Sequence, residues 1–327
     1  MKNKHLTILI TGGAGFIGSS LIEKLILNNN WKIVCLDNLN DYYSPARKKS
    51  NLEPFNNKDN FVFYKTDITD YKGLETIFKK HKINKIIHLA ARAGVRASIK
   101  QPVLYEKVNV FGTLNLLELA RKYKVPHFIF GSSSSVYGNQ NKVPFSETDP
   151  CNHPISPYAA TKKATELLCN TYAYLYDINI TALRFFTVYG PKGRPDMAPY
   201  LFTKAILEDK IIYKFGDGTT RRDYTYIDDI IKGIIKAINK PFSYKIINLG
   251  NNKPITLNKF IQAIENATGK KARIKQKPLP EGDVNQTYAD IRKANKLLSW
   301  HPTINIEKGL ASFVDWYKKT KLNSLKL

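Results

Sequence analysis

The first half of the chain alternates short β-branched runs with helical patterns, and this alternation restricts the possible folds more than any other feature. Five apolar runs are predicted strands, because strands buried on both faces read as continuous hydrophobic stretches. They cover residues 6–10, 32–36, 61–65, 85–88 and 127–130, with helical patterns between them at 16–27, 71–80 and 103–123. Strands that alternate with helices form βαβ units, so the sequence predicts an α/β fold with a Rossmann-type, doubly wound parallel sheet.

The alternation continues through a helical pattern at 157–176 and a strand at 178–184, and it breaks beyond Gly190. Loops then separate shorter elements, which is typical of a smaller domain that closes over a substrate. A helix at 226–238 and a strand at 244–248 return to the sheet. We therefore expect a first domain of residues 1–190, with about 223–249 returning to it, and a smaller C-terminal substrate-binding domain of residues 191–222 and 250–327.

The chain carries a large excess of positive charge. Lysine and arginine number 51 against 27 aspartates and glutamates, which gives a net charge of +24. Such an excess can bind nucleic acid. Here the basic residues are scattered, with no long basic block and no aromatic-basic binding motif. We therefore expect polyanionic small substrates to gain from the field, and no nucleic-acid partner.

The three cysteines, Cys35, Cys151 and Cys169, are an odd number without metal-ligand spacing. They indicate reduced thiols in the cytoplasm and no metal site. The apolar run within residues 1–10 is too short for a signal peptide, and a glycine-rich segment follows where a cleavage site would stand. No stretch approaches the length of a membrane span, so we expect a cytoplasmic protein without a membrane partner.

A glycine-rich loop at residues 12–18 joins the first predicted strand to the first predicted helix. Its glycines let the chain turn tightly and let backbone N–H groups approach a pyrophosphate at the helix N-terminus. Asp37 ends the next strand, 19 residues after Gly18. That carboxylate should bind the adenosine ribose hydroxyls and repel the 2′-phosphate of NADP, so the pattern predicts NAD.

Tyr158 and Lys162 stand four residues apart, on one face of a predicted helix. A free tyrosine has a pKa near 10, which is too high for a base at neutral pH. A nearby ammonium and a positive nicotinamide both favour the phenolate, and lowering the pKa to about 7 takes about 4 kcal/mol. The hydroxyl run at 132–135 ends a strand between the glycine loop and this pair, which favours a catalytic interpretation.

These motifs resemble those of the extended short-chain dehydrogenases that modify nucleotide sugars. The resemblance runs nearly end to end. It also rests on His88-Leu89-Ala90-Ala91 and on the segments at 109–113, 133–138, 222–224 and 281–284. It implies NAD as the cofactor of the first domain and a nucleotide-sugar, most closely a UDP-sugar, as the substrate bound by the second domain.

The resemblance also implies roles for individual residues. Tyr158 is the base at the sugar 4-hydroxyl, with Lys162 and Ser133 as its catalytic partners. The residues that border NAD are Gly12, Gly15, Phe16, Ile17, Gly18, Asp37, Asn38, Asp67, Ile68, Leu89, Ala90, Ala91, Asn109, Tyr158 and Lys162. The residues that bind the UDP-sugar are Ser133, Ser134, Ser135, Thr187, Arg194, Arg222 and Asp283. The family commonly has an arginine shortly before Asp283, and this chain departs from that pattern with Leu279 and Pro280.

The two positions after Ser133 separate the reactions of the family. Relatives that dehydrate the sugar carry Asp-Glu where this chain has Ser134 and Ser135, and relatives that decarboxylate a UDP-uronic acid carry glutamate at the position of Ser135. Serines are poor proton shuttles at neutral pH. Epimerisation at C4 needs neither acid, because a hydride leaves C4, the 4-keto sugar rotates, and the hydride returns to the other face. The pair of serines therefore favours an NAD-dependent 4-epimerase.

Segments 37–43, 184–191 and 193–198 resemble the UDP-glucuronate 4-epimerases. This implies conversion of UDP-glucuronate to UDP-galacturonate, with Arg194 at the sugar carboxylate. The alternative for Arg194 is a solvated loop arginine that pairs with Asp196. For the whole chain, the open alternatives are a UDP-glucose or UDP-xylose 4-epimerase, a UDP-glucuronate decarboxylase, a nucleotide-sugar 4,6-dehydratase and a non-enzymatic NAD-binding regulator.

The helices predicted at 103–123 and 157–176 carry more apolar surface than one sheet face requires. Together with the family pattern, this surface predicts a homodimer. Each subunit would contribute both helices to a four-helix bundle.

Overall fold

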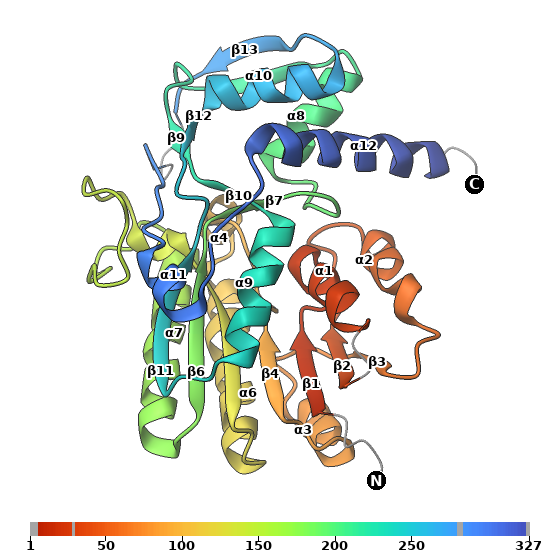
Figure 1. Cartoon of the computed structure of the whole chain (residues 1–327), viewed down its shortest axis with the longest axis vertical. Coiled ribbons are helices and arrows are strands. Elements are labelled where there is room, and N and C mark those ends of the chain that lie inside the picture. The colour runs from red at the N-terminus through yellow and green to blue at the C-terminus, as the bar shows by residue number, and fades with distance from the viewer. Residues whose placement is uncertain (1–5, 28–29, 280–283, 325–327) are drawn as a thin grey trace. The chain divides into compact units, whose positions relative to one another are not determined.

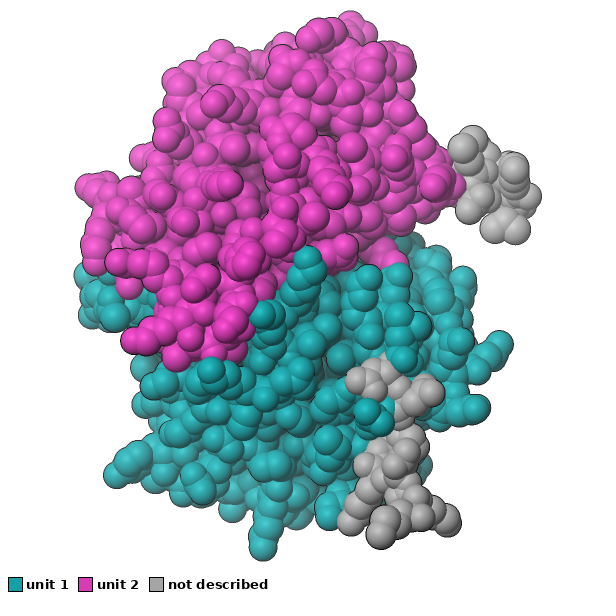
Figure 2. Space-filling view, in the orientation of Figure 1, with its two compact units in different colours: residues 1–138, 147–184, 231–247 teal, residues 139–146, 185–230, 248–327 magenta. Residues whose placement is uncertain are grey.

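The computed structural model describes residues 6–27, 30–279 and 284–324 of the chain. The chain divides into two compact units, which Figure 2 shows in different colours. The first unit comprises residues 1–138, 147–184 and 231–247, and the second comprises residues 139–146, 185–230 and 248–327. Among the described residues, no helix combines the length and the apolar character that crossing a membrane requires.

A seven-stranded sheet forms the centre of the first unit (Figure 1). The strand order is β11-β6-β5-β4-β1-β2-β3, and β1 pairs in parallel with both β2 and β4. The strands are β1 (Leu6–Thr11), β2 (Trp31–Asp37), β3 (Phe61–Lys65), β4 (Lys85–His88), β5 (His127–Ser133), β6 (Asn179–Phe185) and β11 (Tyr244–Leu249). The chain winds outwards from β1 in both directions, so the predicted α/β class with a doubly wound sheet is confirmed.

The inner strands are apolar in their central residues because both of their faces are buried there. Ile8, Leu9 and Ile10 of β1 are fully buried, although successive side chains point to opposite faces of the sheet. The edge strand β3 is only partly buried. A strand covered on both faces cannot alternate apolar and polar residues, which is why uninterrupted apolar runs identify the inner strands.

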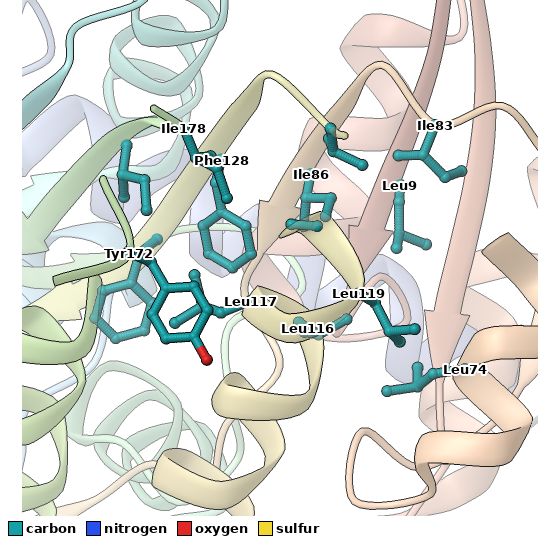
Figure 3. Close-up of a cluster of buried hydrophobic side chains, with 14 of the residues drawn as sticks. Leu9, Leu74, Ile83, Ile86, Leu116, Leu117, Leu119, Phe128, Tyr172 and Ile178 are labelled. Carbon is teal, nitrogen blue, oxygen red and sulfur yellow. The ribbon is translucent and has the colours of Figure 1, made fainter. Parts of the chain in front are cut away.

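Helices pack against this sheet and complete its core. One buried cluster joins Leu9, Ile86 and Phe128 of the strands to Leu116 of α6 and Tyr172 of α7 (Figure 3). The helices that precede β6 are α1 (Phe16–Leu25), α2 (Pro45–Leu52), α3 (Tyr71–Lys80), α4 (Val95–Lys100), α5 (Pro102–Glu106), α6 (Gly112–Lys122) and α7 (Pro157–Tyr176). Two short 3₁₀ turns accompany them, η1 (Glu53–Phe55) and η3 (Ser134–Tyr137).

The helix predicted at 103–123 is not one regular α-helix. Between α5 and α6, residues Lys107–Phe111 form a π-helical turn, η2. A π-helical turn is closed by i→i+5 hydrogen bonds, and over only five residues the hydrophobic pattern does not distinguish it from an α-helix. The turn contains the buried residue Asn109, and such turns often occur at functional sites.

The second unit consists of short strands and helices. Strands β7 and β10 pair in parallel, as do β8 and β13, while β9 and β12 are antiparallel. Its elements are β7 (Thr187–Tyr189), α8 (Ala198–Leu207), β8 (Ile211–Phe215), β9 (Arg221–Arg222), β10 (Tyr224–Tyr226), β12 (Ile255–Thr256), α10 (Leu257–Thr268), β13 (Arg273–Lys277), α11 (Arg292–Leu298) and α12 (Ile306–Ser324). Helix α9 (Ile227–Asn239) and strand β11 each have residues in both units.

A buried carboxylate holds three loops of the second unit together. Asp223 accepts backbone hydrogen bonds from Asn251 at 2.6 Å, from Asn252 at 3.0 Å and from Ala289 at 2.9 Å. Its side chain is fully buried, and this burial raises the pKa of Asp223 to about 6. The carboxylate therefore replaces the regular backbone pairing that these loops lack.

Candidate active site

The loop at 12–18 in the first unit has a backbone shape that requires glycine. Gly12 has a φ of +69°, and a Cβ built there would lie 2.7 Å from the backbone nitrogen of Ala90. A Cβ at Gly18 would lie 2.2 Å from the carbonyl oxygen of Gly12. Gly15 is the N-cap of α1 and has no side chain to bond the first N–H groups of the helix, at Phe16 and Ile17. Those N–H groups and the helix dipole can therefore bind an anion such as a pyrophosphate.

Asp37 is the last residue of β2, and its side chain is buried beside the glycine loop. Its Oδ2 accepts a hydrogen bond from the backbone of Ala14 at 3.2 Å, and its Oδ1 accepts one from Leu39 at 2.9 Å. Burial raises the pKa of Asp37, and the positive charge of Lys48 opposes that shift. The carboxylate thus holds the glycine loop at the end of β2.

Asn38, Asp67 and Ile68 gather at the carboxyl ends of β2 and β3. The amide of Asn38 donates to Asp67 Oδ2 at 2.6 Å. Asp67 Oδ1 accepts from both the backbone and the hydroxyl of Thr69, each at 2.8 Å. Ile68 is buried against α6, where a Cβ at Gly112 would lie 2.7 Å from its side chain. Asn38 and Asp67 therefore lie beside Asp37, and Ile68 packs against α6.

Leu89, Ala90 and Ala91 follow directly after β4. The backbone N–H of Leu89 donates to the carbonyl oxygen of Thr11 at 3.1 Å. Asn109, in the π-helical turn, clamps the next residue, since its Oδ1 accepts from Arg92 N at 2.8 Å and its Nδ2 donates to Arg92 O at 3.0 Å. The predicted nicotinamide residues are thus tied to both β1 and η2.

Tyr158 lies in the first turn of α7. The helix begins here because Ser156 caps it, with Oγ accepting from Ala159 N at 3.2 Å, and because Pro157 suits the first helical position. The ring of Tyr158 meets the ring of Tyr105 edge to face, with centroids 6.2 Å apart. The cap fixes where the helix starts and so fixes the position of Tyr158.

Lys162 lies one turn further along α7 and is buried. Its Nζ donates to the carbonyl oxygen of Gly131 at 2.6 Å, and burial lowers the pKa of Lys162 to about 8. Ser133 ends β5, and its Oγ accepts from Ser135 N and donates to Ser135 Oγ, each at 3.1 Å. Because α7 packs against both β5 and η3, the predicted catalytic residues lie on neighbouring elements.

Three further residues next to this group were not singled out from the sequence, although Ser132 belongs to the hydroxyl run at 132–135 and Arg184 to the segment 184–191. Glu166, one turn after Lys162, forms a two-point ion pair with Arg184 of β6. It also accepts a hydrogen bond from Ser132 Oγ at 2.7 Å. Both charged side chains are 1% exposed. The spacing of four residues between Lys162 and Glu166 was the available signal, but the partner on β6 is visible only in the fold.

The predicted substrate residues of the second unit lie on separate strands and loops. Thr187 begins β7, and its backbone donates to Asp223 O at 3.2 Å. Arg194 pairs with Asp196 through Nε at 3.0 Å and Nη2 at 2.6 Å. Arg222 ends β9, and its Nη1 donates to the carbonyl oxygen of Arg221 at 2.9 Å. Asp283 lies outside the described residues.

The family model described as GDP-mannose 4,6 dehydratase matches residues 9–313 of this chain. The chain belongs to this family. Family members among the curated proteins include the UDP-glucuronate 4-epimerase of Thermodesulfobacterium geofontis, which is 48% identical over 95% of this chain and 96% of its own length. Protein CapI of Staphylococcus aureus is 43% identical over 95% of this chain and 98% of its own length. The resemblance predicted from the motifs is thereby confirmed.

Solved structures of the family share the whole fold. The UDP-glucuronic acid 4-epimerase of Bacillus cereus, in complex with UDP-glucuronic acid and NAD, is 36% identical with a TM-score of 0.90, covering 96% of this chain and 100% of that one. The dTDP-glucose 4,6-dehydratase of Bacillus anthracis, in complex with NAD, is 28% identical with a TM-score of 0.87, covering 97% and 98%. Epimerases and dehydratases of this family therefore share one fold, and the reaction has to be read from the site.

Proposed function

We propose that this chain is an NAD-dependent UDP-glucuronate 4-epimerase, which interconverts UDP-glucuronate and UDP-galacturonate. The observation that carries the proposal is the pair Ser134 and Ser135 in η3, the turn that packs against the helix α7 of the predicted base. Neither side chain can act as the extra acid or base that dehydration requires, whereas epimerisation needs no such group. The similarity to UDP-glucuronate 4-epimerases over nearly the whole chain supports the same reaction.

The glycine loop fits NAD. A Cβ at Gly12 or Gly18 would collide with neighbouring backbone, so the glycines set the shape of the loop, and the start of α1 at Gly15, Phe16 and Ile17 offers N–H donors to a pyrophosphate. When bound, NAD supplies reversible hydride transfer at C4 of the sugar. Asp37 and Asn38 would hold its adenosine ribose, Asp67 and Ile68 its adenine, and Leu89, Ala90, Ala91 and Asn109 the nicotinamide half.

Tyr158 would accept the proton of the sugar 4-hydroxyl during oxidation and return it during reduction. The Lys162 ammonium favours the phenolate electrostatically. Since the pKa of Lys162 is about 8, this residue is mostly protonated at neutral pH. Ser133 would donate a hydrogen bond at the same oxygen once its hydroxyl turns away from Ser135 Oγ, to which it donates in this structure.

Residues of the second unit would bind the rest of the substrate. We assign the diphosphate to Arg222, the uridine ribose to Asp283, and the sugar to Thr187 and Arg194. In this assignment, residues 191–222 and 250–327 form the nucleotide-sugar-binding domain, and residues 1–190 with about 223–249 form the NAD-binding domain.

Product analysis tests the proposed reaction. The purified protein is incubated separately with UDP-glucuronate, UDP-glucose and UDP-xylose, and the products are separated. We expect UDP-galacturonate from UDP-glucuronate, little release of carbon dioxide and no net accumulation of NADH. A dominant UDP-pentose product would identify a decarboxylase, and turnover confined to UDP-glucose or UDP-xylose would identify a different epimerase.

We also propose a homodimer. Helix α7 exposes large apolar side chains to solvent. The exposed fraction is 58% for Leu167, 88% for Tyr174 and 57% for Leu175, and it is 78% for Val103 of α5. Patches of this kind mark protein interfaces. Light scattering should give twice the chain mass, and Leu167→Lys together with Tyr174→Lys should give a monomer.

A further inference from the structure

His88, the first residue of the His-Leu-Ala-Ala motif, is the last residue of β4 and is almost fully buried. Both nitrogens of its ring face hydroxyl groups. Nδ1 lies 2.7 Å from Thr11 Oγ1 at the end of β1, and Nε2 lies 2.8 Å from Thr113 Oγ1 in α6. The histidine therefore bridges the strand that leads into the glycine loop and the helix that follows Asn109.

The neighbouring hydrogen bonds determine which nitrogen carries the proton. Thr113 Oγ1 donates its single hydrogen to the carbonyl oxygen of Asn109 at 2.6 Å. It can therefore only accept at the histidine, so Nε2 must be the donor. In the neutral ring Nδ1 then has no proton and accepts from Thr11 Oγ1.

The surroundings of the ring keep it neutral. Phe128 and Phe130 flank it, with ring centroids 6.0 Å and 5.9 Å away. Burial lowers the pKa of His88 to about 3, and the positive charge of Lys162 acts in the same direction. An imidazolium would also carry a proton on Nδ1, and the hydroxyl of Thr11 could then no longer donate its hydrogen to that nitrogen.

The two ends of this chain of hydrogen bonds lie on the predicted nicotinamide residues. At one end, Thr11 Oγ1 accepts from the backbone N–H of Ala90 at 3.3 Å. At the other end is Asn109, whose amide also donates to Thr161 Oγ1 at 3.1 Å. Thr161 in turn donates to the carbonyl oxygen of Tyr158 at 2.9 Å. Each threonine hydroxyl in this series of hydrogen bonds thus donates its one hydrogen to a single acceptor.

We propose that His88, fixed as the neutral tautomer with its proton on Nε2, is a positioning residue that locks the Ala90 backbone and Asn109 into one geometry for the nicotinamide half of NAD. This inference rests on the proposed function for the identity of the cofactor. A reversed tautomer would place two donors face to face at Thr11 or leave the carbonyl oxygen of Asn109 without the hydroxyl of Thr113.

The tautomer can be measured directly on the wild-type protein. The chain has six histidines, so selective ¹⁵N-histidine labelling gives a small set of ring signals, and loss of one set in His88→Gln assigns it. We expect a protonated Nε2 and an unprotonated Nδ1 that do not change between pH 6 and pH 8. A protonated Nδ1, or a ring that titrates in this range, would overturn the proposal without reference to any substrate.

The positioning role is tested by removing the hydroxyls one at a time. Thr11→Val and Thr113→Val keep the side-chain shape and break the chain on either side of His88. Thr181→Val is the matched control, because Thr181 is a buried threonine of β6 whose hydroxyl has no hydrogen-bond partner among the described residues. Each protein is freed of bound NAD, and calorimetric titration then measures its affinity for NAD. Circular dichroism checks that each variant is folded.

We expect each of the two variants to weaken NAD binding by about tenfold, as for the loss of one well-placed hydrogen bond, while the control stays within about twofold of wild type. An unchanged NAD affinity in both variants would reject the positioning role, even with the expected tautomer. If either variant fails to fold, the wild-type tautomer and the other variant still decide. If the tautomer and the NAD affinities are as expected but the protein does not epimerise UDP-glucuronate, only the proposed function is refuted and the positioning role of His88 stands.

Discussion

Arg184 and Glu166 form a closed, two-point ion pair inside the first unit, with Nε–Oε1 and Nη2–Oε2 distances of 2.8 Å each. The guanidinium also lies 4.7 Å from the ring centroid of Tyr137. The pair joins α7, which carries Tyr158 and Lys162, to the neighbouring strand. Breaking such a pair leaves one charge buried and uncompensated, which costs more than the pair contributes when intact.

Glu166→Gln should therefore lower the free energy of unfolding by about 3 kcal/mol. The glutamine can still accept from Ser132, but its NH₂ group would face the guanidinium of Arg184. Denaturant unfolding measures the loss. Asp209→Asn is the control, because it removes the exposed pair with Lys270 and should cost less than about 1 kcal/mol. Equal losses in the two variants would contradict the structural role of the buried pair.

Tyr158→Phe should reduce kcat by roughly two to four decades, the usual range for loss of a general acid–base group. The ring remains, so the bound NAD content and the affinity for UDP-glucuronate should change little. Tyr105→Phe is a matched control on the neighbouring ring, because the carbonyl oxygen of Ala93 keeps its hydrogen bond from Tyr42. Near-normal turnover in Tyr158→Phe would exclude it as the base.

Arg194→Ala should weaken UDP-glucuronate by roughly tenfold to a hundredfold and UDP much less, because only the sugar has a carboxylate for the guanidinium. The observed pair with Asp196 supplies a second variant. Asp196→Asn removes the charge of this ion pair and should leave the affinity for UDP-glucuronate unchanged or tighter. If Arg194 only holds the loop, both variants should lose both ligands equally in calorimetric titrations.

Asp223 makes the stability depend on pH. Its folded-state pKa of about 6 lies above the ordinary value of 3.8, so the folded state binds this proton more tightly than the unfolded state does. The stability that this group contributes is therefore gained as the pH falls through 6 and lost as the pH rises. Relative to Asp223→Asn, the wild type should gain about 1 kcal/mol in unfolding free energy between pH 7.5 and pH 5. A loss over that range would mean that the three N–H donors outweigh burial.

The parts of the fold that were predicted correctly follow from local sequence patterns. The inner strands, such as β1 and β5, are continuous apolar runs, and the glycine loop between β1 and α1 requires residues without side chains. Helix α2 has no such pattern. Its buried positions include Lys48 and Asn51, which are held by distant partners, since Lys48 Nζ donates to Asn40 O at 2.7 Å and Asn51 Nδ2 to Ala14 O at 3.0 Å.

The candidate site shows the same division. Motifs locate Tyr158 and Lys162 along the chain because their spacing is local, and the hydroxyl run locates Ser133 at the end of a predicted strand. The partners that fix them are far apart in sequence, as Lys162 is from Gly131, or depend on a backbone irregularity, as at Asn109. Hydrophobic periodicity carries no information about either kind of partner, because both arise only when the strands and helices pack.

The bond from Ala14 to Asp37 has a consequence for engineering the cofactor preference. Changing an NAD enzyme to NADP usually begins by replacing the acid at the end of the second strand, to remove its repulsion of the 2′-phosphate. In this chain that replacement would also remove one of the hydrogen bonds that hold the glycine loop, since Asp37 is the acceptor for the Ala14 N–H. A successful redesign would need a small hydroxyl residue at position 37 to keep that acceptor, with the new positive charge supplied from another position.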